Sequence, residues 1–479
     1  MKNYDLLVVG SGAGSNIAAS AYEQGMKVAI VDNGRFGGTC LNRGCIPTKI
    51  LTYVADTIMS VEHSGQINLE AEVKEVDFKG LMERMRRETW HEAEEIAESI
   101  STVDTYDFYN DTGEFIDDYT MRVAGEEIKG EYVILASGAR PLIPPINGLE
   151  DVEYLTNKTI LELDEKPKSL IIVGGGYIAA EFGHFFSAIG TEVTILGRNE
   201  YLVPDEDNDV SELLKKHLDS RMGVYTSHEV RSVRQEGDEK VAVAKNTETG
   251  DETEFKAKHI LVATGRRSNS DILKPEETGV DTDDRGWIIT DKHFRTSKER
   301  IFAFGDALGK HMFRHVANEQ SQIVYYNLMR TIDAEEKDGE PELFGMSYHA
   351  IPRAVFSHPQ IATVGMTLDA AKNTDRRLLV GRSEYTGVAK GAAMGNPDGF
   401  VRVICDAEDR TILGASIIGP HAPILIQEIT NLMNTSERTY IPMFDSIHIH
   451  PALPEVVQRA FGSLAPIDAE HTHHHHNHE

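Results

Sequence analysis

The chain has 479 residues, 40% of them hydrophobic, and its 77 acidic residues outnumber its 48 basic residues to give a formal charge of −29. A chain of this length is too long to fold around one ordinary hydrophobic core, and it predicts about three domains. The negative charge argues against nucleic acid or an anionic membrane as a partner, because both are polyanions. Such a surface suits a salt-rich cytoplasm, although an acidic mesophilic protein has the same composition.

The N-terminal sequence, the apolar runs and the cysteine count indicate the cellular compartment of the protein. The N-terminal sequence has no signal-peptide pattern, and no apolar run reaches the roughly 20 residues that span a bilayer. Three cysteines are too few for a structural disulfide framework. We therefore expect a cytoplasmic protein without a membrane partner.

The first predicted unit is a strand, a glycine-rich turn, a helix and a second strand. Residues 5–9 form the first apolar strand and lead into Gly10-Ser11-Gly12-Ala13-Gly14-Ser15, and residues 27–32 form the second strand. Asp32 lies 20 residues after Gly12, where an acid can bind ribose hydroxyls. Ser15 replaces the third glycine of this dinucleotide pattern, so helix and strand are expected to approach less closely there.

The segment at residues 37–49 contains Cys40 and Cys45. A disulfide needs Cα atoms roughly 4.4–6.8 Å apart, and five residues of regular helix would point the two side chains apart, so we expect a local distortion. Gly44 supplies backbone freedom, and Pro47 suits the start of a helix that continues through Lys49. A helix N-terminus lowers the pKa of a nearby thiol. The alternative is two unrelated buried thiols, and the adjacent glycine-rich unit argues against it.

In the middle of the chain, the sequence pattern predicts helices over residues 52–102 and polar strands over residues 105–129. A second nucleotide-binding unit of strand, glycine-rich turn and helix follows. A strand at residues 132–135 ends in a turn at Gly138, and the second unit comprises strands at residues 169–173 and 192–196 around Gly174-Gly175-Gly176-Tyr177-Ile178. Where an NAD-selective site has an acid, this chain has Gly197 followed by Arg198. A guanidinium can pair with a 2′-phosphate, which favours NADPH over NADH. The alternative for Arg198 is a solvated surface arginine.

The C-terminal third of the chain completes the nucleotide-binding units and then has the pattern of an antiparallel sheet. The second unit closes with a strand at residues 259–262 and Gly265, and the chain returns to the first unit through residues 301–307, which include Asp306. From about residue 345, four apolar runs predict an antiparallel sheet followed by helices. The histidine-rich end, with histidines at 471, 473–476 and 478, is either a native metal-binding tract or a segment added for expression. We predict no other metal site.

The segment GGTCLNRGCIPTK closely resembles the redox-active segment of the pyridine nucleotide-disulfide oxidoreductases, and the other motifs extend the resemblance over nearly the whole chain. It implies an α/β fold similar to glutathione reductase, with two Rossmann-like nucleotide-binding domains and a C-terminal α+β dimerisation domain. The implied boundaries are 1–150 and 267–340 for the FAD-binding domain, 151–266 for the NAD(P)H-binding domain, 345–465 for the dimerisation domain, and 466–479 for a disordered His-rich tail.

The resemblance also implies the catalytic roles. Electrons pass from NADPH through FAD to a Cys40–Cys45 disulfide and on to a small-molecule disulfide, with Cys45 as the charge-transfer thiolate and Cys40 as the interchange thiol. Lys49 and Glu181 match the ion pair beside the flavin. His450 matches the acid–base that Glu455 orients across the interface of a homodimer. His448 has no such context.

Cofactor-binding roles carry over by position. The implied FAD-binding residues are Gly10, Gly12, Gly14, Ser15, Asp32, Gly38, Thr39, Lys49, Gly138, Asp306 and Ala307. The implied residues for the nicotinamide nucleotide are Gly174, Gly176, Tyr177, Ile178, Arg198 and Gly265. Tyr177 matches an aromatic lid, although ordinary helix packing is its alternative. The second basic residue typical of NADPH-specific members is here Pro204, so NADH stays possible.

Features outside the redox core narrow the substrate class. No cysteine follows Cys405, which argues against mercuric reductases and large thioredoxin reductases. The phrases at residues 177–182, 315–318 and 449–457 are similar to mycothione reductase, and the acidic composition suits bis-γ-glutamylcystine as substrate. The alternatives are an NAD-dependent dihydrolipoamide dehydrogenase, or a flavoprotein that binds or regulates and uses its tail as a metal-sequestering arm. The intact set Cys40, Cys45, His450 and Glu455 argues against the second.

Overall fold

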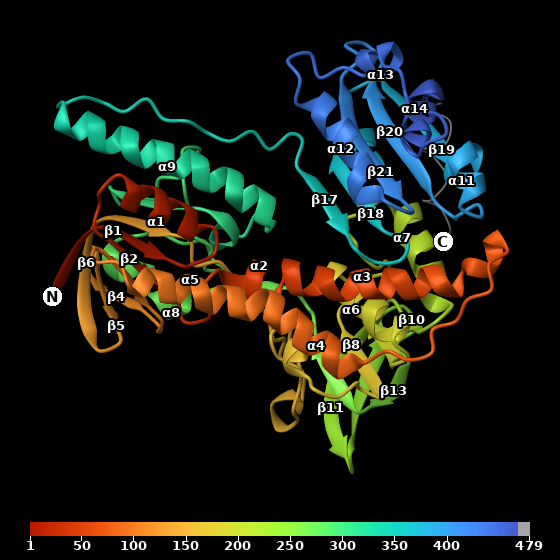
Figure 1. Cartoon of the computed structure of the whole chain (residues 1–479), viewed down its shortest axis with the longest axis horizontal. Helices are drawn as coiled ribbons and strands as arrows, with labels where there is room; N and C mark the ends of the chain where they lie inside the picture. The colour runs from red at the N-terminus through yellow and green to blue at the C-terminus, as the bar shows by residue number, and fades with distance from the viewer. Residues whose placement is uncertain (468–479) are drawn as a thin grey trace.

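Figure 1 shows the computed structural model, in which residues 1–467 are described. The sheet that contains β1, the sheet that contains β8 and the sheet that contains β20 occupy three separate regions, and the long helix α3 (Cys45–Glu62) runs between them. This arrangement confirms the predicted α/β fold with two Rossmann-like units and a C-terminal α+β unit. The residue boundaries of the predicted domains stay a prediction.

The first sheet has seven strands in the order β3-β2-β1-β6-β5-β4, with β16 paired to β6. Alternate residues of β1 face opposite layers, as the pleat requires. Leu6 and Val8 pack with residues of α1 and α9, whereas Leu7 and Val9 pack with residues of β4 and β5. Both faces are therefore covered, which explains the continuous apolar run in β1. The strands are β1 (Lys2–Val9), β2 (Val28–Val31), β3 (Tyr106–Tyr109), β4 (Glu114–Asp117), β5 (Thr120–Val123), β6 (Glu126–Leu135) and β16 (Ile301–Ala303), and the helices are α1 (Gly14–Glu23) and α9 (Arg314–Glu336).

The helices between β2 and β3 connect the first sheet to the rest of the molecule. They are α2 (Gly38–Arg43), α3, α4 (Phe78–Arg86), a π-helical turn (Arg87–His91) and α5 (Glu92–Ser101). α3 packs against α6 of the second unit, and its Leu51, Ala55 and Ile58 share a core with α6. The segment that carries both cysteines is therefore held between two sheets.

The second unit contains a four-stranded parallel sheet in the order β10-β9-β8-β14 and a three-stranded antiparallel sheet. The parallel strands are β8 (Ser169–Val173), β9 (Glu192–Leu196), β10 (Gly223–Tyr225) and β14 (His259–Val262), and the antiparallel strands are β11 (His228–Glu236), β12 (Glu239–Asn246) and β13 (Glu252–Ala257). Its helices are α6 (Tyr177–Ala188) and α7 (Asn208–Asp219). The chain leaves the first unit through β7 (Ala139–Pro141) and returns to it through β15 (Arg266–Ser268), and these two strands pair. The short helix α8 (Ser270–Leu273) follows.

The two glycine-rich turns have the same construction. Gly10 has φ +105°, and a Cβ there would lie 2.1 Å from the carbonyl oxygen of Ala136. Gly174 has φ +133°, and a Cβ there would lie 2.2 Å from the carbonyl oxygen of Ala263. Only glycine fits these positions, because each turn passes directly over the end of the strand that closes its unit.

Ser15 stands next to the residue that makes the close contact between α1 and β1. Its hydroxyl donates to the carbonyl of Gly12 at 2.8 Å, and the close contact between helix and strand is made one residue earlier. A Cβ at Gly14 would lie only 2.8 Å from Val8 Cγ1. The glycine that the pattern requires is therefore present, shifted by one position.

The C-terminal sheet has six strands in the order β17-β18-β21-β20-β19-β22, and every pair is antiparallel, as predicted. β20 and β21 are buried along their full length because α12 and α14 pack on the sheet and α7 contacts β21. The strands are β17 (Pro352–Val355), β18 (Ile361–Gly365), β19 (Leu378–Glu384), β20 (Phe400–Asp406), β21 (Ile412–Ile418) and β22 (Ala465–Pro466). The helices are α10 (Leu368–Lys372), α11 (Ala389–Ala393), α12 (Ala422–Met433), α13 (Ile441–Asp445) and α14 (Pro454–Gly462).

The end of the described chain is ordered in this sheet. Pro466, the first residue of the segment predicted to be disordered, belongs to β22 and pairs with Leu379. The rest of the predicted His-rich tail, residues 468–479, lies outside the described residues. Within residues 1–467, no helix is both long enough and apolar enough to span a bilayer.

Candidate active site

A cavity of about 770 Å³ lies where the first sheet, α2, α3 and α6 meet. Its volume is within the range of small-molecule and cofactor sites. The cavity brings together thirteen of the predicted site residues: Gly10, Gly12, Asp32, Gly38, Thr39, Cys40, Cys45, Lys49, Gly138, Tyr177, Ile178, Glu181 and Asp306. Residues of both glycine-rich units therefore line the same space as the two cysteines.

The two cysteines lie on either side of a helix break. Cys40 is in α2 and Cys45 is the first residue of α3, with Gly44 between the helices at φ −146° and ψ −115°. Thr48 Oγ1 donates to the carbonyl of Gly44 at 2.8 Å and so helps to hold the break. The predicted distortion is present at Gly44, and the new helix begins two residues before Pro47.

The pair of thiols is electrostatically unequal. The Cys40 thiol, acting as a hydrogen-bond donor, lowers the pKa of Cys45 to about 7, and Lys49 acts in the same direction against the effect of burial. The same interaction and burial raise the pKa of Cys40. When both cysteines are reduced, the negative charge therefore resides on Cys45, and Cys40 keeps its proton.

We expect Cys40→Ala to raise the pKa of Cys45, because the donor that stabilises its thiolate is lost. At pH 7 the rate of Cys45 alkylation by iodoacetamide in the reduced protein should fall roughly tenfold, since only the thiolate reacts. The pH dependence of alkylation, followed by mass spectrometry, measures the shift. Cys405, which is buried in β20, serves as the internal unreactive control. An unchanged midpoint would contradict the assigned charge distribution.

An ion pair lies beside the cysteines. Lys49 Nζ is 2.8 and 2.7 Å from the two carboxylate oxygens of Glu181, whose side chain is 6% exposed. The backbone N–H of Phe356 donates to Glu181 Oε1 at 3.1 Å, and Lys49 Nζ lies 4.4 Å from the centre of the Phe356 ring. The ammonium is thus fixed by α6 and by the segment after β17, and it presents a positive charge to the cavity.

The cavity residues fit FAD. Among residues 1–467, Arg266 Nε and Asn318 Oδ1 are buried without a hydrogen-bond partner, and both residues line the cavity. Asp306 Oδ2 lies 3.6 Å from Arg266 Nε, and burial raises the pKa of Asp306. Together with the N–H groups that start α1, these unpartnered donors and acceptors match a ligand that carries phosphates and hydroxyls.

Asp32 is held in place for such a ligand. Its Oδ2 accepts hydrogen bonds from the N–H and the hydroxyl of Ser11 at 2.8 and 2.6 Å, and its Oδ1 accepts one from the N–H of Gly34 at 3.1 Å. The carboxylate therefore joins the end of β2 to the first glycine-rich turn.

Several predicted residues lie outside the cavity lining. Gly14 contacts Val8 of β1, Ala307 is buried with residues of the first sheet, and the Ser15 hydroxyl is bonded to the Gly12 carbonyl. Gly174, Gly176 and Gly265 belong to the second glycine-rich turn and its closure, and the Arg198 side chain is exposed at the end of β9. Tyr177 begins α6 and is 41% exposed at the cavity. The roles predicted for these residues stay predictions.

His450 and Glu455 form the predicted pair but lie apart from the cysteines of their own chain. His450 Nδ1 is 2.9 Å from Glu455 Oε1, and the N–H of Ala452 donates to Glu455 Oε2 at 3.1 Å. The hydrogen bond to His450 lowers the pKa of Glu455. Neither residue lines the cavity, and the His450 side chain is 69% exposed. The neighbouring Ile447 and Ile449 are 100% and 78% exposed, an apolar surface typical of a subunit contact.

His448 is different from its neighbour. Its side chain is 6% exposed, and Nε2 lies 3.0 Å from Glu428 Oε1 of α12. It faces its own domain, whereas His450 faces outward. His448 can therefore serve as a control residue for substitutions of His450.

Among the cavity residues that sequence reasoning missed are Arg266, Arg314, Asn318 and Phe356. Arg266 directly follows Gly265, which closes the second nucleotide unit, and Arg314 is the first residue of α9. The sequence could have indicated both arginines as site residues, because each is a charged residue next to a predicted motif. Phe356 carried no signal, because its role depends on a contact with Glu181, 175 residues away.

Comparison with known proteins agrees with this geometry. Residues 4–321 match the family described as pyridine nucleotide-disulphide oxidoreductase, and residues 351–461 match its dimerisation domain. The chain is 34% identical to mycothione reductase of Mycobacterium tuberculosis (strain CDC 1551 / Oshkosh) over 97% of this chain and 100% of that protein. It is 32% identical to dihydrolipoyl dehydrogenase 2 of Haloarcula marismortui over 98% of each.

A solved structure has the same fold. The HOCl-induced flavoprotein disulfide reductase RclA from Escherichia coli, in its Cu(II) complex, superposes with a TM-score of 0.83 at 25% identity. The superposition covers 96% of this chain and 99% of that one.

Proposed function

Because the chain belongs to the pyridine nucleotide-disulphide oxidoreductase family and is an FAD-dependent NAD(P)H:disulfide oxidoreductase, we propose that it uses NADPH to reduce a low-molecular-weight thiol disulfide through Cys40 and Cys45. The substrate class that we propose is bis-γ-glutamylcystine or a disulfide similar to mycothione. The observation that carries the proposal is the pair of unequal thiols beside the Lys49–Glu181 ion pair in one cavity.

FAD would be held by Gly10, Gly12, Asp32 and Asp306, and when bound it supplies the transfer of two electrons between a nicotinamide nucleotide and the cysteine pair. The Lys49 ammonium would favour a negative charge beside it. Glu181, fixed by the N–H of Phe356, would keep that ammonium in place.

The cysteines would carry the exchange with the substrate. The Cys40 sulfur, as a thiolate, attacks one sulfur of the substrate disulfide; the substrate S–S bond breaks, and one substrate thiolate leaves. The Cys45 thiolate then attacks the Cys40 sulfur, releases the second substrate thiolate and forms the Cys40–Cys45 disulfide. The cysteine pair is oxidised by two electrons and the substrate is reduced by two.

These exchange steps require a base and an acid near Cys40. The pKa of Cys40 is raised while Cys45 carries the charge, so Cys40 must lose its proton to a neighbouring group before it attacks. We propose that His450 of the partner subunit accepts this proton and returns it to the leaving thiolate. Glu455 would orient its imidazole and stabilise the protonated form.

The preference for NADPH rests on the end of β9. Gly197 follows this strand and carries no carboxylate to repel a 2′-phosphate, and the exposed Arg198 can pair with one. The relatives named as dihydrolipoyl dehydrogenases make oxidation of dihydrolipoamide by NAD⁺ the competing activity.

The decisive test is steady-state oxidation of NADPH and of NADH with bis-γ-glutamylcystine, glutathione disulfide and lipoamide as alternative acceptors, at low and high salt. We expect kcat/KM to be highest for NADPH with bis-γ-glutamylcystine or a mycothione-like disulfide. Turnover of lipoamide with NADH as the preferred nucleotide would overturn the proposal.

Arg198→Ala provides the matched control for the nucleotide. It should raise KM for NADPH about tenfold, through loss of one charge-assisted hydrogen bond, and leave KM for NADH unchanged. Equal changes for both nucleotides would show that Arg198 does not recognise the 2′-phosphate.

A further inference from the structure

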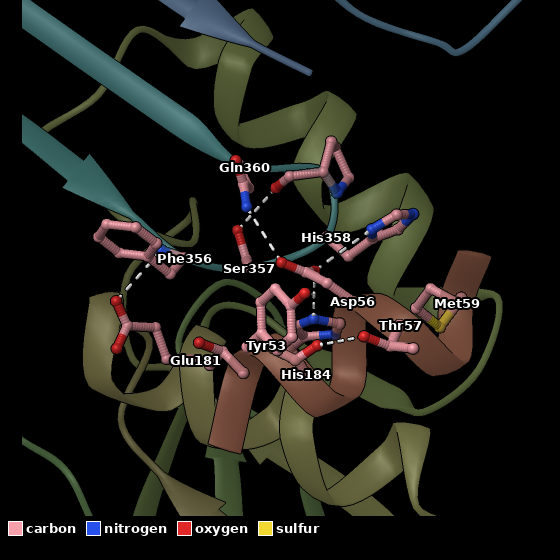
Figure 2. A network of polar contacts seen from close by, with 12 residues as sticks. Tyr53, Asp56, Thr57, Met59, Glu181, His184, Phe356, Ser357, His358 and Gln360 are labelled. Carbon is pink, nitrogen blue, oxygen red and sulfur yellow. Dashed lines mark hydrogen bonds and ion pairs between the residues drawn. The ribbon is translucent and has the colours of Figure 1, made fainter. Parts of the chain in front are cut away.

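A second polar cluster lies on α3 away from the cavity. Asp56 Oδ1 is 2.9 Å from His184 Nε2 of α6 and 3.7 Å from His358 Nδ1, and Asp56 Oδ2 accepts a hydrogen bond from Gln360 Nε2 at 3.1 Å. Figure 2 shows these side chains converging on the carboxylate from α3, α6 and the segment between β17 and β18. We call these four residues the Asp56 cluster.

The protonation state of His184 follows from its partners. Arg221 Nη2 lies 3.0 Å from His184 Nδ1, and a guanidinium can only donate, so Nδ1 accepts. The proton of the neutral ring is therefore on Nε2 and is donated to Asp56. Burial and Arg221 lower the pKa of His184 to about 4, which keeps the ring neutral.

Asp56 is ionised in this setting. Burial opposes its charge, but the hydrogen bond with His184 and the nearby His358 outweigh burial and lower the pKa of Asp56 to about 2. Other charged or titratable groups around the cluster include Arg221, Glu62, His217 and His63, and the His63 ring stacks on His358. The Asp56 carboxylate on α3 thus accepts hydrogen bonds from two other segments, α6 and the stretch between β17 and β18.

The same three segments form the ion pair at the cavity. On α3, Asp56 is seven residues after Lys49, which places both on one face two turns apart. On α6, His184 is three residues after Glu181, again on one face. After β17, His358 is two residues after Phe356, whose N–H binds Glu181 (Figure 2). The segments are therefore joined twice, once at the cavity and once at the Asp56 cluster.

We infer that the Asp56 cluster positions the Lys49–Glu181 ion pair, so that Asp56 and His184 are positioning residues for flavin reduction by NADPH. This inference rests on the proposed function, in which Lys49 lies beside the flavin. Apolar packing of α3 on α6 tolerates small shifts of one helix along the other, whereas directional polar contacts at two levels fix both the register and the rotation of α3. Loss of the second contact allows the ammonium and the carboxylate to shift relative to the cavity.

A double-mutant cycle tests the inference in the FAD-loaded enzyme. Asp56→Asn should slow flavin reduction by NADPH about tenfold in stopped-flow measurements, because small displacements of charged groups at a reacting centre lower rates steeply. In the Lys49→Met background the same substitution should change the rate less than about twofold, since the group it positions is gone. A rate loss of the same factor in both backgrounds would overturn the inference.

Two controls separate positioning from general stability. Asp207→Asn removes another buried carboxylate that joins α7 to the C-terminal sheet, where it binds Ser416 and Arg402 at 2.8 and 3.0 Å. It should lower the melting temperature without slowing flavin reduction. His184→Gln keeps an amide donor for Asp56 and should retain at least half of the rate; a loss as large as that of Asp56→Asn would contradict the assigned hydrogen bond.

A structural readout completes the test. In a crystal structure of Asp56→Asn, the distance from Lys49 Nζ to the Glu181 carboxylate should exceed hydrogen-bond range; an unchanged ion pair overturns the inference. If Lys49→Met alone leaves flavin reduction unchanged, the role of Lys49 in the proposed function fails and the inference fails with it. A slow Lys49→Met enzyme with additive effects of Asp56→Asn overturns only the positioning role.

Discussion

Cys40→Ser is expected to lower turnover of disulfide substrates by more than about 10³-fold while leaving reduction of the bound flavin by NADPH intact. A serine hydroxyl cannot form the mixed disulfide that begins the exchange, whereas the glycine-rich turns and the Lys49–Glu181 pair stay unchanged. Steady-state assays with the disulfide acceptor measure the first effect. Stopped-flow absorbance under anaerobic conditions measures the second.

The matched control for this substitution is Cys405→Ser. Cys405 is fully buried in β20, so its thiol contacts no substrate. Turnover should stay within about twofold of the wild-type value, since the change affects only packing. Undiminished disulfide reduction by Cys40→Ser would overturn the proposed mechanism, and loss of flavin reduction by that variant would show that Cys40 has a role before substrate exchange.

His450→Ala should lower disulfide turnover about 10²- to 10³-fold, because Cys40 then loses the group that accepts its proton and protonates the leaving thiolate. Glu455→Gln should have a smaller effect, since it keeps a hydrogen-bond acceptor for His450 and removes only the charge. Steady-state turnover across pH measures both variants. A His450→Ala enzyme with wild-type turnover would remove His450 from the mechanism.

The location of His450 makes a sharper test possible. If the site combines Cys40 of one subunit with His450 of the other, inactive Cys40→Ser and His450→Ala subunits can complement each other. Random reassociation of equal amounts should restore about a quarter of wild-type activity, because half of the dimers contain one intact site of two. No recovery in verified hybrid dimers would place both residues in the same subunit's site.

His448→Gln is the control for His450. His448 is buried against Glu428, so its replacement should lower the melting temperature and leave turnover unchanged. A large loss of turnover in this variant would mean that the exposed loop near Ile447 and Ile449, and not the His450 imidazole itself, determines activity.

The sequence predicted those parts of the molecule that depend on local spacing. Gly10 and Gly174 mark turns where no side chain fits, and Gly44 marks the break between Cys40 and Cys45. Both constraints act within a few residues, so they leave a readable pattern. Gly14 and Ser15 show the limit of such patterns. The glycine that the close contact between α1 and β1 requires lies one position before the place that the pattern assigns to it.

The residues that the sequence did not reveal act over long separations. Phe356 contributes a backbone N–H, which any residue other than proline can supply, so no side-chain pattern predicts its contact with Glu181. His184 lies in an apolar helix and has no motif around it. Its partner Asp56 is 128 residues away, and only the packing of α3 on α6 brings the two together.

The position of β16 in the first sheet has a consequence for synthesis of the chain. β16 pairs with β6 only after residues 139 to 300 have been made, and Asp306 follows it directly. An emerging polypeptide folds from its N-terminus, so β1, β2 and β6 can associate early while the cavity that Asp306 lines stays incomplete. The pairing of β7 with β15 brings the two ends of the intervening segment together, which lets that segment fold as an insertion and then deliver β16 to its place. The cavity is therefore completed late in the biogenesis of this protein, after more than 300 residues have been translated.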